Sequence, residues 1–143
     1  MLRFNWENSF SIGIVEIDLQ HKKFIDIIND LIESMNNFLD MASVEQNFER
    51  LMNYTAWHFG TEEEYMEKFE YPELDIHKAE HNRIFQKIVK IQEQFFQSTA
   101  LSDENEKMKV LFDLSGFLFE WLIKHIQQSD FKYAELFRKN GLK

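Results

Sequence analysis

Apolar residues recur at intervals of three and four along most of this chain, which is the spacing of amphipathic helices. The pattern predicts four long helices, at residues 19–39, 44–69, 75–97 and 103–128, and a short terminal helix at 131–139. Residues 1–17 lack this period and are expected to form an ordered N-terminal arm. Four long helices with short connections favour an all-α fold, an up-down-up-down four-helix bundle.

Capping and breaking residues predict where the helices begin and end. The expected caps are Asp18, Ser43 (in a capping box with Gln46) and Asp75. Tyr71-Pro72 should stop the second helix, because the residue before proline disfavours helical backbone. The polar stretch 98–103 is expected to be a loop. In the arm, four apolar side chains should pack on the bundle: Trp6, Phe10, Ile12 and Ile14.

Composition narrows the class of protein. The chain has 143 residues, enough for one domain (1–143) with its own core. Its 15 Phe make disorder unlikely, and its content of only 4 Gly and 1 Pro favours long helices. A net charge of -9 argues against nucleic acid as a partner. The chain contains no run of 18 apolar residues, so no membrane span is predicted. The first residues do not resemble a signal peptide. We therefore expect a cytoplasmic protein.

All five histidines of the chain fall on the predicted inner faces of the helices. They are His21, His58, His77, His81 and His125. A lone inner histidine is more often a hydrogen-bonded core residue than a metal ligand. Surface positions outnumber core positions, however, so five of five on inner faces is hard to explain in that way. The pattern therefore predicts a buried cluster of metal ligands.

Two carboxylates are expected to join these histidines. Glu62 lies four residues after His58, on the same helix face. Asp130 lies five residues after His125, a spacing that reaches the same site only if the helix loosens near residues 127–129. The alternative role of Asp130 is to cap the terminal helix. Glu63 and Glu64 fall off the inner face and are expected to be solvated.

Imidazole and carboxylate ligands without sulfur suit iron, manganese or zinc, and the chain has no cysteine. Five histidines and two carboxylates exceed the needs of one ion, so two ions are implied. If both carboxylates and one solvent-derived oxygen bridge the ions, an ion with three histidines is six-coordinate. The other ion, with two histidines, then keeps one open position for a small molecule.

The ordered motifs resemble the hemerythrins, specifically the single-domain bacteriohemerythrins, over nearly the whole chain. The matching stretches are Trp6 to Phe10, Asp18-Leu-Gln-His21-Lys-Lys, His58-Phe-Gly-Thr-Glu62-Glu, His77-Lys-Ala-Glu-His81 and Trp121-Leu-Ile-Lys-His125 continuing to Asp130-Phe-Lys-Tyr133. The resemblance implies two non-haem irons joined by an oxo or hydroxo group. It places one iron on His77, His81 and His125, the other on His21 and His58, and makes Glu62 and Asp130 the bridges.

The resemblance also implies reversible O2 binding at the two-histidine iron, which makes the protein an oxygen carrier or store and not an enzyme. Leu122 matches the family's pocket leucine, and Phe59 and Trp121 are candidates to wall the O2 pocket, although both also suit an ordinary core. We expect a monomer that delivers O2, with an O2-consuming enzyme as a candidate partner.

Other functions are compatible with some of these residues. The same site could serve a sensor of O2, redox state or nitric oxide, or a module for iron handling or peroxide detoxification. A ferritin-like di-iron enzyme needs Glu three residues before a ligand histidine, a pattern that this chain lacks. A zinc hydrolase of the His-Glu-x-x-His type is excluded, because no histidine here is followed by glutamate.

Overall fold

Helices dominate the computed structural model, which describes residues 3–37, 41–100 and 104–143. The four long helices are α1 (Val15–Asn37), α2 (Met41–Lys68), α3 (Leu74–Ala100) and α4 (Glu104–Lys124). The shorter elements are the 3-10 turn η1 (Asn8–Phe10), the π-helical segment η2 (His125–Asp130) and α5 (Phe131–Lys139). No strand occurs in the described part of the chain, so the predicted all-α class is confirmed.

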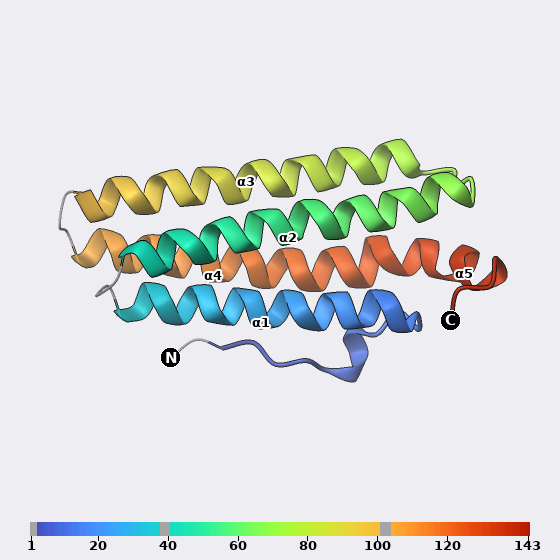
Figure 1. The fold of residues 1–143 in the computed structure, drawn as a ribbon, viewed down its shortest axis with the longest axis horizontal. Helices are drawn as coiled ribbons and strands as arrows, with labels where there is room; N and C mark the ends of the chain where they lie inside the picture. Colours follow the sequence, from blue (N-terminus) through green and yellow to red (C-terminus); the bar gives the residue numbers. More distant parts are fainter. Residues whose placement is uncertain (1–2, 38–40, 101–103) are drawn as a thin grey trace.

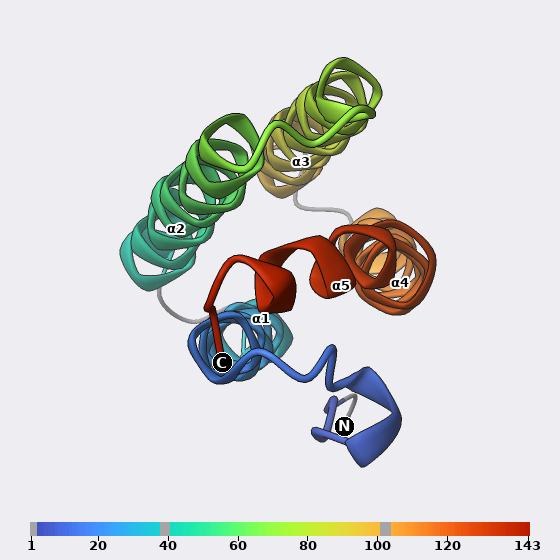
Figure 2. The same cartoon turned by 90° about the vertical axis from the view of Figure 1, so that its right-hand side faces the viewer.

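The four long helices lie side by side and alternate in direction (Figure 1). Seen from one end, they surround a common core, with contacts between α1 and α2, α2 and α3, α3 and α4, and α1 and α4 (Figure 2). The predicted up-down-up-down bundle is therefore correct.

Helical spacing of apolar residues explains why these segments fold as amphipathic helices. In α3, the positions that helical spacing predicts to face inward are all buried: His77, His81, Ile84, Ile88, Ile91 and Phe95. In α1, Phe24, Ile28 and Leu31 are fully buried at the same spacing. Burying each large apolar side chain stabilises the fold by about 1.5–3 kcal/mol. The histidines share these faces, so the packing that forms the core also delivers them to it.

Three helices begin earlier than their predicted caps. α1 begins at Val15, and the carboxylate of Asp18 lies within its first turn. That carboxylate accepts hydrogen bonds from the backbone N–H of Ile12 (2.9 Å) and from the hydroxyl of Ser11, so it fastens the arm to the helix. α2 begins at Met41, which places Ser43 inside the helix and makes the predicted capping box wrong.

The other boundaries lie close to their predicted positions. α3 begins at Leu74, one residue before Asp75. α2 ends at Lys68, just before Tyr71-Pro72. Of the predicted loop at 98–103, residues 98–100 are helical and residues 101–103 lie outside the described residues. α5 spans 131–139 as predicted.

The arm and the C-terminal segment close one end of the bundle together. The arm follows the outside of α1, where Phe10, Ile12 and Ile14 are buried and Trp6 packs against the core (Figure 1). The segment α5 crosses the end of the bundle (Figure 2). Arg138 donates a hydrogen bond from Nη1 to the carbonyl oxygen of Ile12 (2.8 Å), which joins the two ends of the chain.

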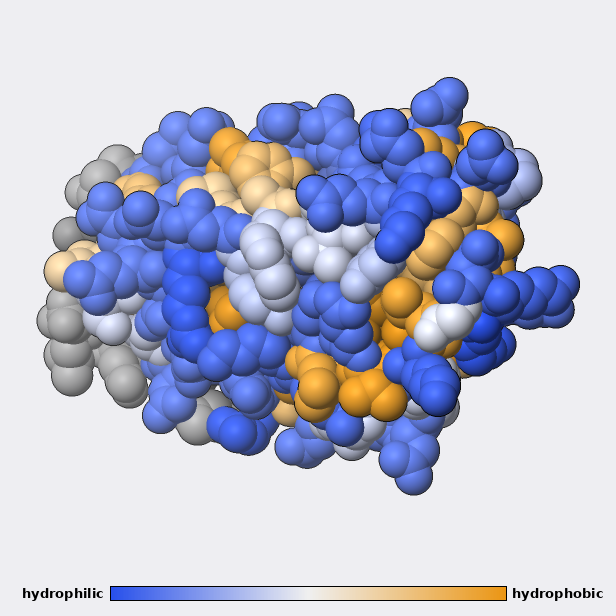
Figure 3. Space-filling view, turned by 45° about the vertical axis from the view of Figure 1, so that its right-hand side comes forward, coloured by the Kyte–Doolittle hydropathy of each residue, from blue (hydrophilic) through white to orange (hydrophobic). Residues whose placement is uncertain are grey.

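The face shown in Figure 3 is mostly hydrophilic, in keeping with the net charge of -9, and its hydrophobic side chains gather toward the end that carries α5. Among the described residues, none of the helices has the length and hydropathy needed to span a bilayer. This agrees with the expectation of no membrane span.

Candidate metal centre

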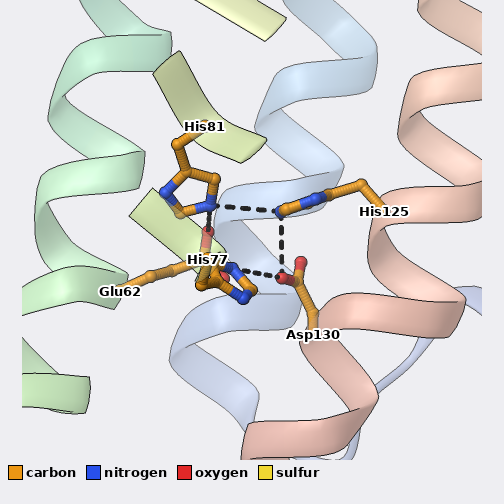
Figure 4. Close-up of side chains that lie close together, drawn as sticks. All are labelled: Glu62, His77, His81, His125 and Asp130. Atoms are coloured by element: carbon orange, nitrogen blue, oxygen red, sulfur yellow. Dashed lines mark hydrogen bonds and ion pairs between the residues drawn. The ribbon is translucent and has the colours of Figure 1, made fainter. Parts of the chain in front are cut away.

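Seven polar side chains lie together inside the bundle, near the end that α5 covers. They come from α1 (His21), α2 (His58 and Glu62), α3 (His77 and His81) and η2 (His125 and Asp130). Each is at most 4% exposed. Figure 4 shows five of them pointing toward one another from α2, α3 and η2. The structure therefore brings all seven predicted residues into one buried cluster.

The π-helical segment η2 explains how Asp130 reaches this cluster. An ideal α-helix would rotate a residue five positions after His125 away from the site. In η2 the wider turn returns Asp130 to the inner face, where its Oδ1 lies 3.1 Å from Nε2 of His125. The predicted loosening of the helix is thus observed. The alternative role of Asp130 is wrong, because its side chain makes no capping hydrogen bond to α5.

Asp130 spans the cluster with both of its carboxylate oxygens. Its Oδ1 faces Nε2 of His77 at 3.3 Å and Nε2 of His125 at 3.1 Å. Its Oδ2 faces Nε2 of His21 at 3.2 Å. One carboxylate therefore contacts histidines of both predicted half-sites, as a bridging ligand must.

Glu62 also contacts both half-sites, but through a single oxygen. Its Oε1 lies 2.8 Å from Nε2 of His58 and 3.7 Å from Nε2 of His81. Its other oxygen, Oε2, accepts a hydrogen bond from the hydroxyl of Tyr133, a fully buried residue of α5. Tyr133 was not predicted as a site residue, although it lies three residues after Asp130, a spacing that keeps both on one helix face.

Several of these atoms approach one another without forming hydrogen bonds. Glu62 Oε1, His77 Nε2 and both oxygens of Asp130 are buried and lack a hydrogen-bond partner. Leaving such groups unpaired in a core is costly. A cation placed among them would accept all these lone pairs at once. The residues present therefore fit a bound metal.

The ligand atoms divide into two groups, each compact enough to surround one ion. One group is His77, His81, His125, Glu62 and Asp130, and the other is His21, His58 and Glu62. The close contact of Asp130 Oδ2 with His21 extends the second group. The arrangement matches the predicted division into a three-histidine position and a two-histidine position with shared carboxylates.

Three residues outside the cluster contact ligand histidines through Nδ1, the ring nitrogen that points away from the cluster. Nδ1 of His58 contacts Gln20 Oε1 at 2.6 Å, Nδ1 of His81 contacts Glu63 Oε2 at 3.0 Å, and Nδ1 of His125 contacts Glu80 Oε1 at 2.7 Å. Such contacts fix the orientation and tautomer of a metal-binding histidine. The expectation that Glu63 is solvated is wrong, because α3 brings His81 against it, whereas Glu64 is exposed as predicted.

Burial and charge in the cluster set the protonation states of the ligand groups His58, His81, His125 and Asp130, and in the metal-free protein all of these except His125 are in the form that binds a cation. Burial lowers the pKa of His58, and burial likewise lowers that of His81 to about 3, so both rings are neutral. Burial opposes the ionised form of Asp130, but contacts with His125 and the other histidines outweigh it and hold the carboxyl pKa well below its ordinary value. Burial would also lower the pKa of His125, yet Asp130 and Glu80 raise it to about 10.

This last shift predicts that the metal-free protein releases a proton when it binds a cation. Below pH 10 the metal-free His125 carries an extra proton, which must leave before the ring can act as a ligand. The apparent affinity for Co2+ should therefore rise about tenfold for each pH unit between 7 and 9. Calorimetric titrations in buffers of different ionisation enthalpy measure this proton, and a pH-independent affinity would contradict the prediction.

Two of the three predicted pocket residues pack against ligand histidines, and the third lines a cavity. The ring of Phe59 stacks on His81, with centroids 3.7 Å apart and planes within 1°. Trp121 lies 6.2 Å from the ring of His125. Leu122 is buried and lines a cavity of about 230 Å³ between the arm, α1 and α4, whose other walls include Phe4, Phe10 and Ile25.

Comparison with known proteins places the chain in a family. The profile of the Hemerythrin HHE cation binding domain matches residues 12–137. A bacteriohemerythrin of Stenotrophomonas maltophilia is 31% identical over 130 residues, covering 91% of this chain and 78% of its own. A bacteriohemerythrin of Clostridium acetobutylicum is 27% identical over 92% of this chain and 99% of its own, and a myohemerythrin of Theromyzon tessulatum is 28% identical over 91% and 90%.

Solved structures agree with this placement. The crystal structure of a wild-type hemerythrin superposes with a TM-score of 0.77 at 26% identity, covering 94% of this chain and 97% of the other. The fold and the buried cluster define a cation-binding helical bundle. The chain belongs to the hemerythrin family.

Proposed function

We propose that this protein binds O2 reversibly at a carboxylate-bridged pair of irons and acts as an oxygen carrier or store, not as an enzyme. The observation that carries the proposal is the unequal division of five histidines around two shared carboxylates. His77, His81 and His125 would hold one iron, and His21 and His58 the other, with Glu62 and Asp130 shared. Two ferrous ions held there would supply the two electrons that O2 accepts reversibly.

The side chains around the cluster suit this task. A reversible O2 site must exclude water, which would otherwise promote irreversible oxidation. Phe59 and Trp121 pack against ligand histidines, and Leu122, three residues before His125, lines the cavity beneath the arm. We infer that this cavity is the route by which O2 reaches the two-histidine position, and that these three residues wall the O2 pocket.

The test is the spectrum of the reduced, iron-loaded protein. On exposure to air it should gain a ligand-to-iron charge-transfer band in visible light, and deoxygenation should abolish that band. A chain purified without iron after iron-replete expression would contradict the site itself. If the protein holds two irons but oxidises at once, without a reversible band, oxygen carriage is contradicted. That result would favour either a sensor of O2, redox state or nitric oxide, or a protein that consumes peroxide.

Replacing Leu122 with Ala should hasten autoxidation, because the smaller side chain lets water pass from the cavity to the cluster. We expect an increase of about tenfold in the rate at which the reversible band decays, measured in air at constant temperature. Leu31→Ala is the matched control, because Leu31 is a fully buried leucine of α1 that does not line the cavity. Equal autoxidation rates in the wild type and Leu122→Ala would show that Leu122 only fills space in the core.

A further inference from the structure

The outer contacts of the histidines divide unevenly between the two metal positions. Behind the three-histidine position stand two carboxylates, Glu63 on His81 (3.0 Å) and Glu80 on His125 (2.7 Å). Behind the two-histidine position, His58 contacts only the amide oxygen of Gln20 (2.6 Å). Nδ1 of His21 is buried and has no hydrogen-bond partner among the described residues. The formal charge behind the rings is therefore negative on one side and zero on the other.

Glu80 is held firmly in this role. Besides its contact with His125, its two oxygens accept hydrogen bonds from the hydroxyl of Ser129 at 3.0 and 2.9 Å. Ser129 belongs to the same π-helical segment that turns Asp130 inward. Glu63 and Glu80 are each only about a quarter exposed, at 25% and 26%, so solvent screens them in part and to a similar degree.

The chemistry of this arrangement favours different charges on the two metals. A carboxylate that accepts the N–H of an imidazole makes the ring a stronger electron donor to the metal on its other side. A neutral amide does this less. A stronger donor set stabilises the more highly charged ion, so it lowers the reduction potential of the ion it holds.

We propose that Glu63 and Glu80 make the three-histidine position the first to lose an electron, which leaves the two-histidine iron ferrous in the half-oxidised protein. This rests on the proposed di-iron function but not on O2 binding. Glu63 and Glu80 are positioning residues in this scheme, since they act through His81 and His125 and touch no metal. The ion with the open position is then the one that keeps its electron longer.

Stepwise oxidation under nitrogen tests this assignment. Each step passes one electron from a ferrous ion to hexacyanoferrate(III), giving a ferric ion and hexacyanoferrate(II), so two potentials are measured. Glu63→Gln and Glu80→Gln should raise the first potential and narrow the gap between the two. Gln20→Glu adds a carboxylate behind His58, so it should lower the second potential and narrow the gap as well. Glu64→Gln is the matched control and should move neither potential, because Glu64 is exposed.

The opposite result is equally clear. A wider gap between the two reduction potentials in Glu63→Gln, Glu80→Gln and Gln20→Glu would show that the two-histidine iron is oxidised first, and this would overturn the proposal. An unchanged gap in these variants would overturn it as well. Failure of the O2 spectrum in air leaves this titration valid, because it contains no O2. A wild-type chain without two irons would instead refute the proposed site.

A second measurement covers variants that lose iron. Titration of the metal-free proteins with Co2+ reports the affinity of the first equivalent, which the stronger donor set should direct to the three-histidine position. Glu63→Gln should weaken that first affinity about tenfold, as outer-contact losses at metal sites generally do, because the ring of His81 is neutral and no proton competes there. Glu64→Gln should leave it unchanged. A first affinity in Glu63→Gln equal to that of the wild type would overturn the proposal.

Discussion

Replacing Glu62 with Ala is expected to leave no more than one iron per chain. Glu62 Oε1 contacts His58 and His81, which belong to different half-sites, so its loss removes a ligand from both. The two-histidine position would keep only His21, His58 and one oxygen of Asp130, too few to hold an ion tightly. The other position would keep three histidines and Asp130.

Iron per chain, measured by elemental analysis after anaerobic loading and desalting, gives the outcome. Glu64→Ala is the matched control, because it removes the same charge two residues further along α2 from an exposed position. The control should retain two irons and the folded helix content of the wild type. A Glu62→Ala protein that also retains two irons would show that Glu62 is not a bridge.

The bundle and the cluster were both predictable because one period governs them. In α1, α2 and α3, the positions that carry apolar residues three and four apart are the positions that carry the histidines, and His125 continues the inner face of α4 into η2. Once the helices pack through these faces, His81 and His125 have to meet, although they are 44 residues apart. The displacement of Asp130 was predictable too, since only a wider helical turn could bring it to the site.

Helix starts were less predictable because tertiary contacts set them. Asp18 has the chemistry of a cap, yet its carboxylate binds the N–H of Ile12 in the arm, and α1 continues three residues upstream of it. Ser43 likewise suits a cap, but α2 begins two residues earlier at Met41, whose side chain packs against the core. The sequence identifies residues that are able to cap a helix, but tertiary packing determines where the helix begins.

The outer contacts could not be deduced from one helix at a time. Glu63 falls about 100° from Glu62 around α2, so the period places it outside the core. It meets His81 only because α3 packs beside that flank of α2. Gln20 and Glu80 directly precede the ligand residues His21 and His81 in sequence, but polar residues at such positions are common. Their contacts with His58 and His125 depend on how the helices pack.

Cation binding should stabilise the fold strongly, because the metal-free core contains two ionised carboxylates. Glu62 and Asp130 are fully buried, and neighbouring histidines lower the pKa of both despite the burial that opposes ionisation. An ion that binds only the folded state adds about 4 kcal/mol when its free concentration is ~1,000 times its dissociation constant. Each kcal/mol raises the melting temperature of a domain of this size by roughly 2–4 °C.

Each bound cation should therefore raise the melting temperature by about 8–16 °C, measured by circular dichroism of the metal-free protein with and without Co2+ under nitrogen. Because Glu62→Ala removes a ligand from both half-sites, its rise should be no more than half that of the wild type, while Glu64→Ala should show the full rise. Equal melting temperatures with and without metal in the wild type would mean that cations do not bind the folded chain in preference to the unfolded one. In that case the buried carboxylates would be satisfied by histidines alone, and the convergence of the seven side chains would owe nothing to a metal.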